Sequence, residues 1–326
     1  MSQLFVLDFW IFVLVMAGIW AIFALGLQLQ YGVAGLMNFG HVGMMALSSY
    51  SMAILVIKLH WNLWIAIVAG VAVAALGGAV LGLTTLRVRG DYFAIVTIAF
   101  SEIIRLIAYN QDGLTGGANG TIAINPAGDG FYAVPFDSFL NHVGNILHPI
   151  LGSRVQNRDT RMVFVVWAVA IILMVGVARL EATPFARVLR SLREDDHVPA
   201  ALGKDVFRFR LYALIIGSAL AGIAGIFWAM QFTLVAPVDF ESTTTFYAWI
   251  VMILGGATLV RGVPLGAIVF SFLFAGTRFF SFPPFSWFTD SQRSYLRLMI
   301  IGAILIYLMF RRPQGILGSR EEMVLE

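Results

Sequence analysis

The chain has 326 residues, of which 60% are hydrophobic and only 12% are charged, and its mean hydropathy is +0.86. Soluble domains carry about 25% charged residues, so this composition predicts a membrane protein. Arginines that fix the membrane topology explain the net charge of +3 better than nucleic-acid binding does. Because the chain has no cysteine, disulfides, thiolate metal sites and cysteine catalysis are excluded.

Long runs without charge predict the membrane-spanning helices. No Asp, Glu, Lys or Arg occurs between Phe9 and Ile57, and about 20 apolar residues suffice for one crossing. The runs do not alternate as the strands of a β-barrel would, and the N-terminus lacks the basic start and cleavage site of a signal peptide. We therefore predict an all-α polytopic fold in a single transmembrane domain (1–326), with about nine spans near residues 10–29, 36–57, 61–86, 92–109, 162–178, 211–232, 243–260, 263–280 and 297–310.

Two long connections, 110–161 and 179–210, separate these spans. The second is the most basic part of the chain, and basic residues collect on the cytoplasmic side of membrane proteins. This places 179–210 inside the cell and 110–161 outside as an external loop, with the N-terminus outside and the C-terminus inside. Glycine and asparagine in "DGLTGGANG" and "NPAGDG" predict turns within the external loop.

The inner connection contains signals for two short helices. Thr183 followed by Pro184 predicts the start of the first, and Gly203 can end the second. Between them lies an acidic patch, 194–196. Three arginines recur every three residues and form one basic flank: Arg187, Arg190 and Arg193. This pattern looks like a cytoplasmic docking element, but composition alone favours the alternative, a solvated, topology-setting loop whose arginines meet lipid phosphates.

Five stretches, taken in chain order, carry a resemblance to a known family: "GLMNFGHVGMMALSSY" (35–50), "LRVRGDYFAIVTIAFSEIIRL" (86–106), "LTGGANG" (114–120), "PFARVLRSLREDDHVPAALGKDVFRFRLYAL" (184–214) and "RRPQGILG" (311–318). They resemble the permease subunits of the branched-chain amino-acid type of bacterial ABC importer. The chain looks like the longer, M-type partner of the two permeases in such importers. The resemblance covers residues from about 30 to 318.

The resemblance implies an ABC importer permease fold and a multi-pass subunit of the bacterial inner (plasma) membrane. The expected substrates are branched-chain or other hydrophobic amino acids, which the family moves by alternating access. The implied partners are a second homologous permease, two cytoplasmic ATPases, an extracytoplasmic substrate-binding protein and membrane lipid. We expect no enzyme activity, metal or cofactor in this chain, because ATP and Mg belong to the ATPases and no G-x-x-x-x-G-K-[ST] phosphate loop occurs here.

The inner connection matches the cytoplasmic coupling segment of the family. His197 and Pro199 depart from the apolar or small residues that are usual there, and Pro199 could start the second short helix. The resemblance assigns ATPase coupling to nine residues: Arg190, Arg193, Glu194, Asp195, Asp196, Ala200, Ala201, Leu202 and Gly203.

Four polar side chains in the predicted span 92–109 are candidates for the transport pathway. Thr97, Ser101 and Arg105 follow one another at i, i+4 steps, with Glu102 alongside. Since a charge near mid-membrane costs about 2.5–3.5 kcal/mol, we expect Glu102 and Arg105 to be buried within about 5 Å of each other or of another polar group. The pair either fixes helix packing or lines the solute path; in a third reading Arg105 snorkels to the membrane surface.

A second polar cluster lies in the glycine-rich stretch 35–50. Asn38 and His41 stand in an apolar run whose glycines permit close helix packing or a broken helix, and transport sites often form where helices break near the midplane. We hypothesise that Asn38 and His41 border the pathway. The alternative is tight packing around a hydrogen-bonded histidine.

Two other functions remain open. Relatives in the same family carry urea, short amides or small carboxylates, and no residue here selects among these substrates. An ion-coupled secondary transporter would need its own ion site, for which Glu102 is one of the few carboxylates in the apolar runs. A membrane enzyme is excluded as far as motifs allow, because neither H-E-x-x-H nor G-x-S-x-G occurs.

Overall fold

The computed structural model describes residues 7–86, 90–122, 133–152, 157–276, 289–311 and 315–317. In these residues the protein is almost entirely helical. The α-helices are α1 (Leu7–Leu27), α2 (His41–Ile57), α3 (Leu63–Thr85), α4 (Gly90–Asn110), α5 (Asp112–Thr115), α6 (Ala133–Leu151), α7 (Arg158–Glu181), α8 (Pro184–Glu194), α9 (His197–Ala201), α10 (Val206–Phe232), α11 (Ser242–Gly255), α12 (Gly262–Gly276) and α13 (Asp290–Arg311). The shorter elements are a π-helical turn η2 (Gln28–Val33), 3-10 turns η3 (Gly117–Asn119) and η5 (Pro237–Phe240), and strands β1 (Thr121–Ile122) and β2 (Leu234–Val235).

Each predicted span overlaps an observed helix, although α11 ends at Gly255, before the predicted end at 260, and residues 277–280 of another span lie outside the described part of the chain. Five helical stretches of the described chain are long and apolar enough to cross a membrane: Leu7–Val33, Leu63–Thr85, Tyr92–Asn110, Arg158–Glu181 and Val206–Phe232. Three apolar helices are shorter: His41–Ile57, Ser242–Gly255 and Gly262–Ala275. The all-α polytopic fold is therefore confirmed, although the predicted span 36–57 begins too early, because the chain is not helical before His41.

Two of the long helices form the centre of the bundle. The most apolar window of Leu7–Val33 is 83% buried and that of Val206–Phe232 is 72% buried, against only 17% for α7. Small residues let α10 approach its neighbours: a Cβ on Gly222 would lie 2.7 Å from that of Ala74 on α3, and a Cβ on Gly78 would lie 2.6 Å from that of Ser218. Since lipid gives helices no hydrophobic reason to associate, such close backbone packing stabilises the bundle.

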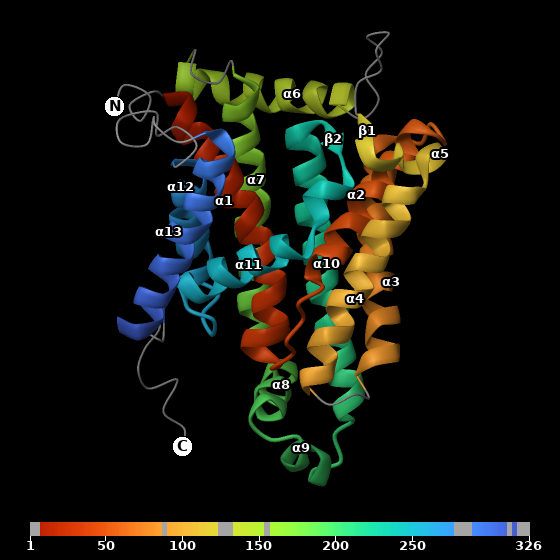
Figure 1. The fold of residues 1–326 in the computed structure, drawn as a ribbon, viewed down its shortest axis with the longest axis vertical. Helices are drawn as coiled ribbons and strands as arrows, with labels where there is room; N and C mark the ends of the chain where they lie inside the picture. Colours follow the sequence, from red (N-terminus) through yellow and green to blue (C-terminus); the bar gives the residue numbers. More distant parts are fainter. Residues whose placement is uncertain are drawn as a thin grey trace.

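The two ends of the bundle differ, as Figure 1 shows. Helix α6 lies crosswise over one end, which we call the α6 end, and α8 and α9 project from the opposite end, the α8 end. The segment predicted as an external loop thus contains a 19-residue helix that the sequence analysis missed. Its buried face is narrow, with Phe136 and Leu140 in the core, and polar residues around these two hid the helical pattern.

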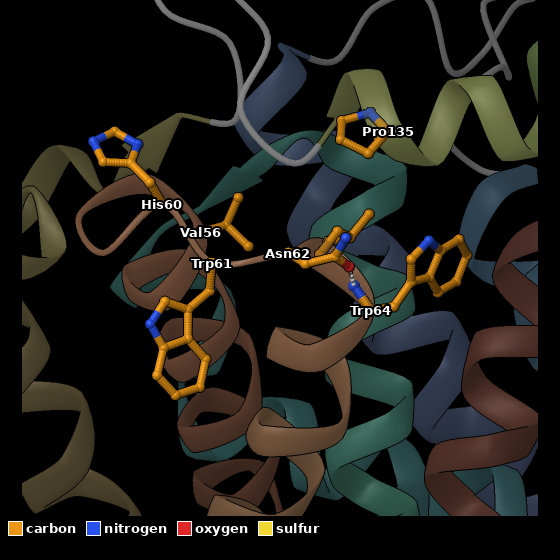
Figure 2. Close-up of a pocket in the computed structure, with 7 residues that line it drawn as sticks. Val56, His60, Trp61, Asn62, Trp64 and Pro135 are labelled. Atoms are coloured by element: carbon orange, nitrogen blue, oxygen red, sulfur yellow. Dashed lines mark hydrogen bonds between the residues drawn. The ribbon is translucent and has the colours of Figure 1, made fainter.

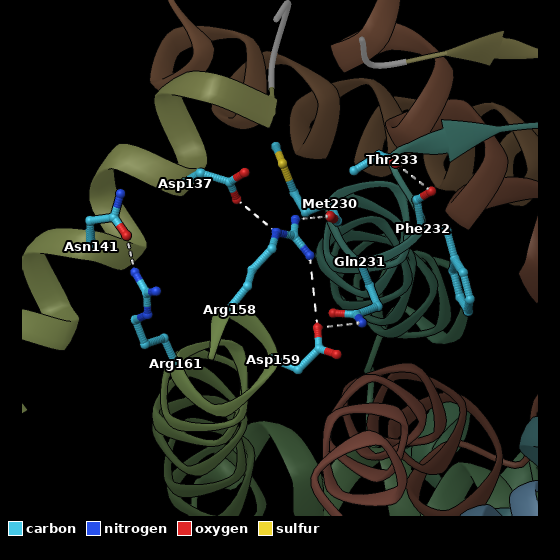
Figure 3. Close-up of polar contacts among 9 residues, drawn as sticks. All are labelled: Asp137, Asn141, Arg158, Asp159, Arg161, Met230, Gln231, Phe232 and Thr233. Atoms are coloured by element: carbon cyan, nitrogen blue, oxygen red, sulfur yellow. Dashed lines mark hydrogen bonds and ion pairs between the residues drawn. The ribbon is translucent and has the colours of Figure 1, made fainter. Parts of the chain in front are cut away.

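Polar contacts fix α6 to the bundle (Figure 3). Arg158, at the start of α7, donates through Nε to Asp137 Oδ1 of α6 at 2.8 Å and through Nη2 to the carbonyl oxygen of Met230 at 2.7 Å. Gln231 Nε2 donates to Asp159 Oδ1 at 3.2 Å. Because the side chains of Arg158 and Asp137 are 30% and 41% exposed, the ion pair is worth at most about 1 kcal/mol; its effect is to orient α6.

A small cavity of about 270 Å³ opens beside the start of α6, at the turn between α2 and α3 (Figure 2). The Asn62 side chain caps α3 by accepting a hydrogen bond from the backbone N–H of Trp64 at 2.9 Å. Trp61 and Trp64 are 47% and 46% exposed. Tryptophan is enriched where a membrane meets water, so these two rings are placed as anchors at the α6 end.

Of the two segments predicted to form turns, 112–120 consists of the short helix α5, the 3-10 turn η3 and two glycines around η3, Gly116 and Gly120, which both have φ +74°. The other segment, 125–130, lies outside the described residues. Strand β1 follows 112–120 and pairs antiparallel with β2, so that Thr121 faces Val235 and Ile122 faces Leu234. The turn therefore packs against the chain that follows α10.

Candidate functional site

The site is built around a break between α1 and α2. The α-helix ends at Leu27, continues as the π-helical turn η2 to Val33, and then leaves helical geometry until His41. Gly35 has φ +70°, a conformation that only glycine adopts without strain. The glycines of 35–50 were expected to permit either close packing or a broken helix, and the helix is broken here, which leaves backbone polar groups inside the bundle that need partners.

Gln30 and Asn38 provide some of these partners. Gln30 Nε2 donates to the carbonyl oxygen of Leu214 on α10 at 3.1 Å, and Gln30 Oε1 accepts from Asn38 Nδ2 at 3.0 Å. Asn38 Oδ1 in turn accepts from the backbone N–H of Gly40 at 3.0 Å. Both side chains are completely buried, and Gly217 leaves room for Gln30, since a Cβ there would lie 2.6 Å from Gln30 Cγ. The network ties the break to α10.

The same break touches α4 through Thr97. Thr97 Oγ1 accepts from the backbone N–H of Phe39 at 3.1 Å and donates to the carbonyl oxygen of Ala94 at 2.7 Å. A Cβ on Gly40 would collide with the backbone oxygen of Thr97. The chain entering α2 is therefore held directly against the backbone of α4.

Ser101 continues this contact one turn along α4. A Cβ on Gly43 would lie 2.9 Å from the Cα of Ser101, and the Ser101 hydroxyl donates to the carbonyl oxygen of Ile98 at 2.8 Å. Thr97 and Ser101 are both buried, at 0% and 2% exposure. The structure brings them together with Asn38 as part of one helix contact.

His41 begins α2 in a fully buried position. Its Nε2 lies 3.2 Å from the carbonyl oxygen of Phe23 on α1, so this nitrogen carries the proton that the carbonyl accepts. The ring stacks on Phe23 with centroids 4.9 Å apart. Nδ1 has no hydrogen-bond partner in the described part of the chain. His41 therefore packs α2 against α1 and keeps one unused acceptor.

The Glu102–Arg105 pair forms as predicted but lies in a different environment. Arg105 Nε donates to Glu102 Oε2 at 2.9 Å and to Oε1 at 3.1 Å. The expected pairing is confirmed. The expected burial is wrong, because the Arg105 and Glu102 side chains are 20% and 38% exposed. Residues one turn apart on a helix meet on its surface, and here that surface is left uncovered by this chain.

At the α8 end, the two short helices are present. Thr183 is the N-cap of α8 and Pro184 is its first residue, and Gly203 follows α9 with φ +71°. Both predictions are confirmed. Pro199, however, is the third residue of α9 rather than its first; just before the helix, Asp195 Oδ1 accepts from the backbone N–H of His197 at 2.8 Å in an Asx turn.

Arg193 connects α8 to the helix break. Its Nη1 donates to the carbonyl oxygen of Gly32 at 2.6 Å, and a Cβ on Gly35 would lie 2.9 Å from Arg193 Cγ. The arginine thus caps the end of η2, where carbonyl groups have no partner within the helix. Because Gly32 follows Gln30 by two residues in the same turn η2, this hydrogen bond joins the connection 179–210 to the Gln30–Asn38 network.

A second contact strengthens this join. Arg190 Nη2 donates to the carbonyl oxygen of Glu181 at the end of α7 at 2.5 Å, and the Glu181 carboxylate accepts from Gln28 Nε2 of η2 at 2.8 Å. Arg190 and Arg193 were expected on the basic flank of this short helix. Instead both guanidinium groups turn back onto this chain, because helix-end carbonyls attract them.

The tip of the connection is open. Glu194, Asp195, Ala200, Ala201 and Gly203 are exposed. Two apolar side chains are exposed as well: Val198 at 53% and Leu202 at 74%. The tip of the projecting connection therefore carries two uncovered apolar side chains.

Asp196 lies deeper in the connection than the tip. It accepts from Arg210 Nη1 at 2.8 Å, which fixes α9 to α10. Asp196 therefore differs from the other acidic residues of the patch, which face away from the bundle.

Sequence reasoning missed Gln28, Gln30, Glu181 and Arg210. The signal available for the two glutamines was their presence in a run that otherwise has no charged and few polar residues. A buried amide must be hydrogen-bonded, so a glutamine pair just before a glycine-rich stretch indicates a helix break.

The apolar helices, the break inside the bundle and the projecting two-helix loop define a polytopic membrane permease. The chain belongs to the family described as branched-chain amino acid transport system, permease component, whose sequence profile matches residues 9–309.

Individual relatives agree with this family. The chain is 30% identical over 310 residues to the high-affinity branched-chain amino acid transport system permease protein LivM of Salmonella typhimurium, covering 93% of this chain and 68% of that one. It is 23% identical over 343 residues to the probable branched-chain amino acid transport permease protein LivM of Methanocaldococcus jannaschii, covering 94% and 93%. It is 22% identical to the permease protein LivH of Escherichia coli, covering 93% and 92%. No solved structure matches the chain.

Proposed function

We propose that this chain is one of two permeases that form the pore of an ABC importer for branched-chain or other hydrophobic amino acids. Family membership supports the permease role, and the names of the relatives, which are branched-chain amino acid transport permeases, support the substrate class. The transport system of Escherichia coli includes permease chains named LivM and LivH, and this chain is similar to both. That similarity supports a second, homologous permease as the partner.

In the membrane, the proposed orientation has the α8 end in the cytoplasm and the α6 end outside, with about nine spans, the N-terminus outside and the C-terminus inside. The basic residues of 179–210 support it, as does the start of α1, where Asp8 Oδ1 accepts from Asn157 Nδ2 at the α6 end at 3.4 Å. The bacterial inner membrane is the proposed location. An extracytoplasmic binding protein would then approach α6 and the 114–120 turn.

The tip around Val198 and Leu202 is the proposed contact for the cytoplasmic ATPases, which carry ATP and Mg. The observation that carries the proposal is the hydrogen bond from Arg193 to Gly32. Through it, a displacement of α8 by an ATPase acts directly on η2 and on the Gln30–Asn38 network. Alternating access requires two arrangements of the bundle that the ATPase can bias, and the break is the element proposed to change.

The direct test is ATPase activity of the reconstituted complex in lipid. The chain is combined with its partner permease, ATPases and binding protein, and substrate-loaded binding protein is added. Stimulation by leucine, isoleucine or valine is the expected result. Stimulation only by urea, a short amide or a small carboxylate would keep the architecture and replace the substrate. Failure to assemble with any ATPase would contradict the docking role of α8 and α9 and reopen an ion-coupled transporter.

The proposed pathway residues are Asn38, His41, Thr97, Ser101, Glu102 and Arg105. Four of them, Asn38, His41, Thr97 and Ser101, lie where the break contacts α4 or α1, and the unused Nδ1 of His41 supports a role beyond packing.

For His41 the proposal predicts that His41→Ala slows transport about 5-fold or more, the lower end of measured coupling between sites. The matched control is Phe23→Leu, which loosens the same ring stack without removing a polar atom. Transport and stimulated ATPase activity that are equal in the two variants would show that His41 only packs.

A further inference from the structure

A cavity of about 550 Å³ lies at the α8 end, between the last turns of α7 and the turn that precedes α12. Its wall is formed by Ile171, Met174 and Val175 of α7, and its rim carries Arg179 and Arg261. None of these residues belongs to the helix break or to the tip of the α8–α9 connection.

The lining residues of α7 follow a single helical stripe. Ile171, Met174, Val175 and Arg179 occupy positions i, i+3, i+4 and i+8, which lie on one face. Eight residues of α-helix rise about 12 Å. The cavity therefore continues as an apolar groove that runs from a charged rim toward the middle of a helix long enough to cross a membrane.

The two arginines at the rim have no partners in the described part of the chain. Both are exposed, whereas Arg158, Arg193 and Arg210 each donate to a carboxylate or a carbonyl oxygen. Arg261 stands in the turn before α12, so the two guanidinium groups approach the rim from different elements. The cavity thus has two positive charges at the end of a span and hydrocarbon below them.

We propose that this cavity binds an anionic phospholipid, with its phosphate between Arg179 and Arg261 and an acyl chain along Ile171 and Val175. Arginine pairs favour phosphate through charge-assisted hydrogen bonds, and basic pockets between membrane helices bind acidic headgroups. Free phosphate would leave the apolar groove empty. A choline headgroup would bring a third positive charge to the rim. Because only 17% of the most apolar window of α7 is buried by this chain, its surface is available to lipid.

The test is native mass spectrometry of the assembled transporter, titrated with phosphatidylglycerol or with phosphatidylcholine of the same acyl chains. The double variant Arg179→Gln/Arg261→Gln is expected to bind one phosphatidylglycerol fewer, or to bind it about 30-fold more weakly, since each basic residue near a membrane surface contributes roughly fivefold in affinity. Phosphatidylcholine binding should not change. Arg187→Gln, an exposed arginine of α8 outside the cavity, is the matched control and should bind as the unsubstituted chain does.

Two further measurements distinguish binding of the lipid from binding of its phosphate alone. Arg179→Lys/Arg261→Lys retains the charge and should recover most of the phosphatidylglycerol binding, and millimolar inorganic phosphate should not displace the lipid. The proposal is overturned if the glutamine variant loses both lipids equally, or if it loses neither, as expected when the partner permease covers the cavity. Displacement by inorganic phosphate would show that the rim binds an anion without the groove.

Discussion

Gly40→Ala should lower the free energy of unfolding of the permease more than a glycine-to-alanine substitution at any other position in the helix break. The alanine Cβ would collide with the backbone oxygen of Thr97, and backbone cannot rotate away as a side chain can. Overpacking lowers the free energy of unfolding by about 1–3 kcal/mol, and a clash with backbone should have an effect near the upper value. Thermal unfolding in detergent should show a midpoint several degrees lower, with less assembled complex recovered.

The control for this variant is Gly176→Ala. Gly176 lies within α7, and a Cβ there would meet nothing within 4 Å, so its stability should be unchanged or slightly higher. Gly40 has φ −97°, which alanine adopts freely, so any loss comes from the contact with α4 and not from backbone strain. Equal midpoints for the two variants would mean that the break and α4 are not in contact.

Arg193→Ala should uncouple ATP hydrolysis from transport. The substitution removes the bond to the Gly32 carbonyl, and a charged hydrogen bond contributes about 1.5–3 kcal/mol. Coupling between sites of about 1–3 kcal/mol corresponds to roughly 5–150-fold. We therefore expect stimulation of ATPase activity by substrate-loaded binding protein to fall by at least about 5-fold, while basal ATPase activity and assembly are kept.

Arg187→Ala is the comparison for this experiment. Arg187 lies on the same helix and is exposed, but its side chain touches no polar group in the described part of the chain. It should keep most of the stimulation. If both variants lose stimulation equally, the loss reflects docking of α8 and not transmission to η2; if Arg193→Ala retains full stimulation, the proposed route through Gly32 is wrong.

Much of the fold follows from the sequence because the membrane allows few alternatives. Hydrocarbon leaves backbone groups no partner outside the chain, so a long apolar run must be helical. The two short helices were predictable for a local reason, since Thr183–Pro184 and Gly203 act within one turn. Helix α6 was not predictable from composition, because it covers the end of the bundle and needs only Phe136 and Leu140 in the core.

The site was less predictable than the fold. Asn38 and Thr97 lie in one site because Gly40 packs against the backbone of α4. This contact joins residues that are 57 positions apart, so no local sequence pattern encodes it. Arg190 and Arg193 were predicted to form part of a basic flank of α8, because arginines at this spacing lie on one side of a helix. Their turn toward Glu181 and Gly32 depends on where α7 and η2 end, which only the assembled bundle determines.

The two-residue ladder between β1 and β2 holds the start of the chain that leads into α11. Helix α11 has 14 residues and is therefore about 21 Å long, whereas the hydrocarbon core of a membrane is about 30 Å thick. The run 233–241, which precedes α11 and is not α-helical, must therefore span the remaining depth. Strand β1 provides hydrogen-bond partners for backbone groups of this run, which lipid cannot provide. Thr245 of α11 then accepts from the backbone N–H of Val42 in the first turn of α2 at 3.0 Å. We therefore expect a displacement of the 112–122 segment at the α6 end to act, through β2 and α11, on the start of α2, next to the break that Arg193 contacts from the opposite end.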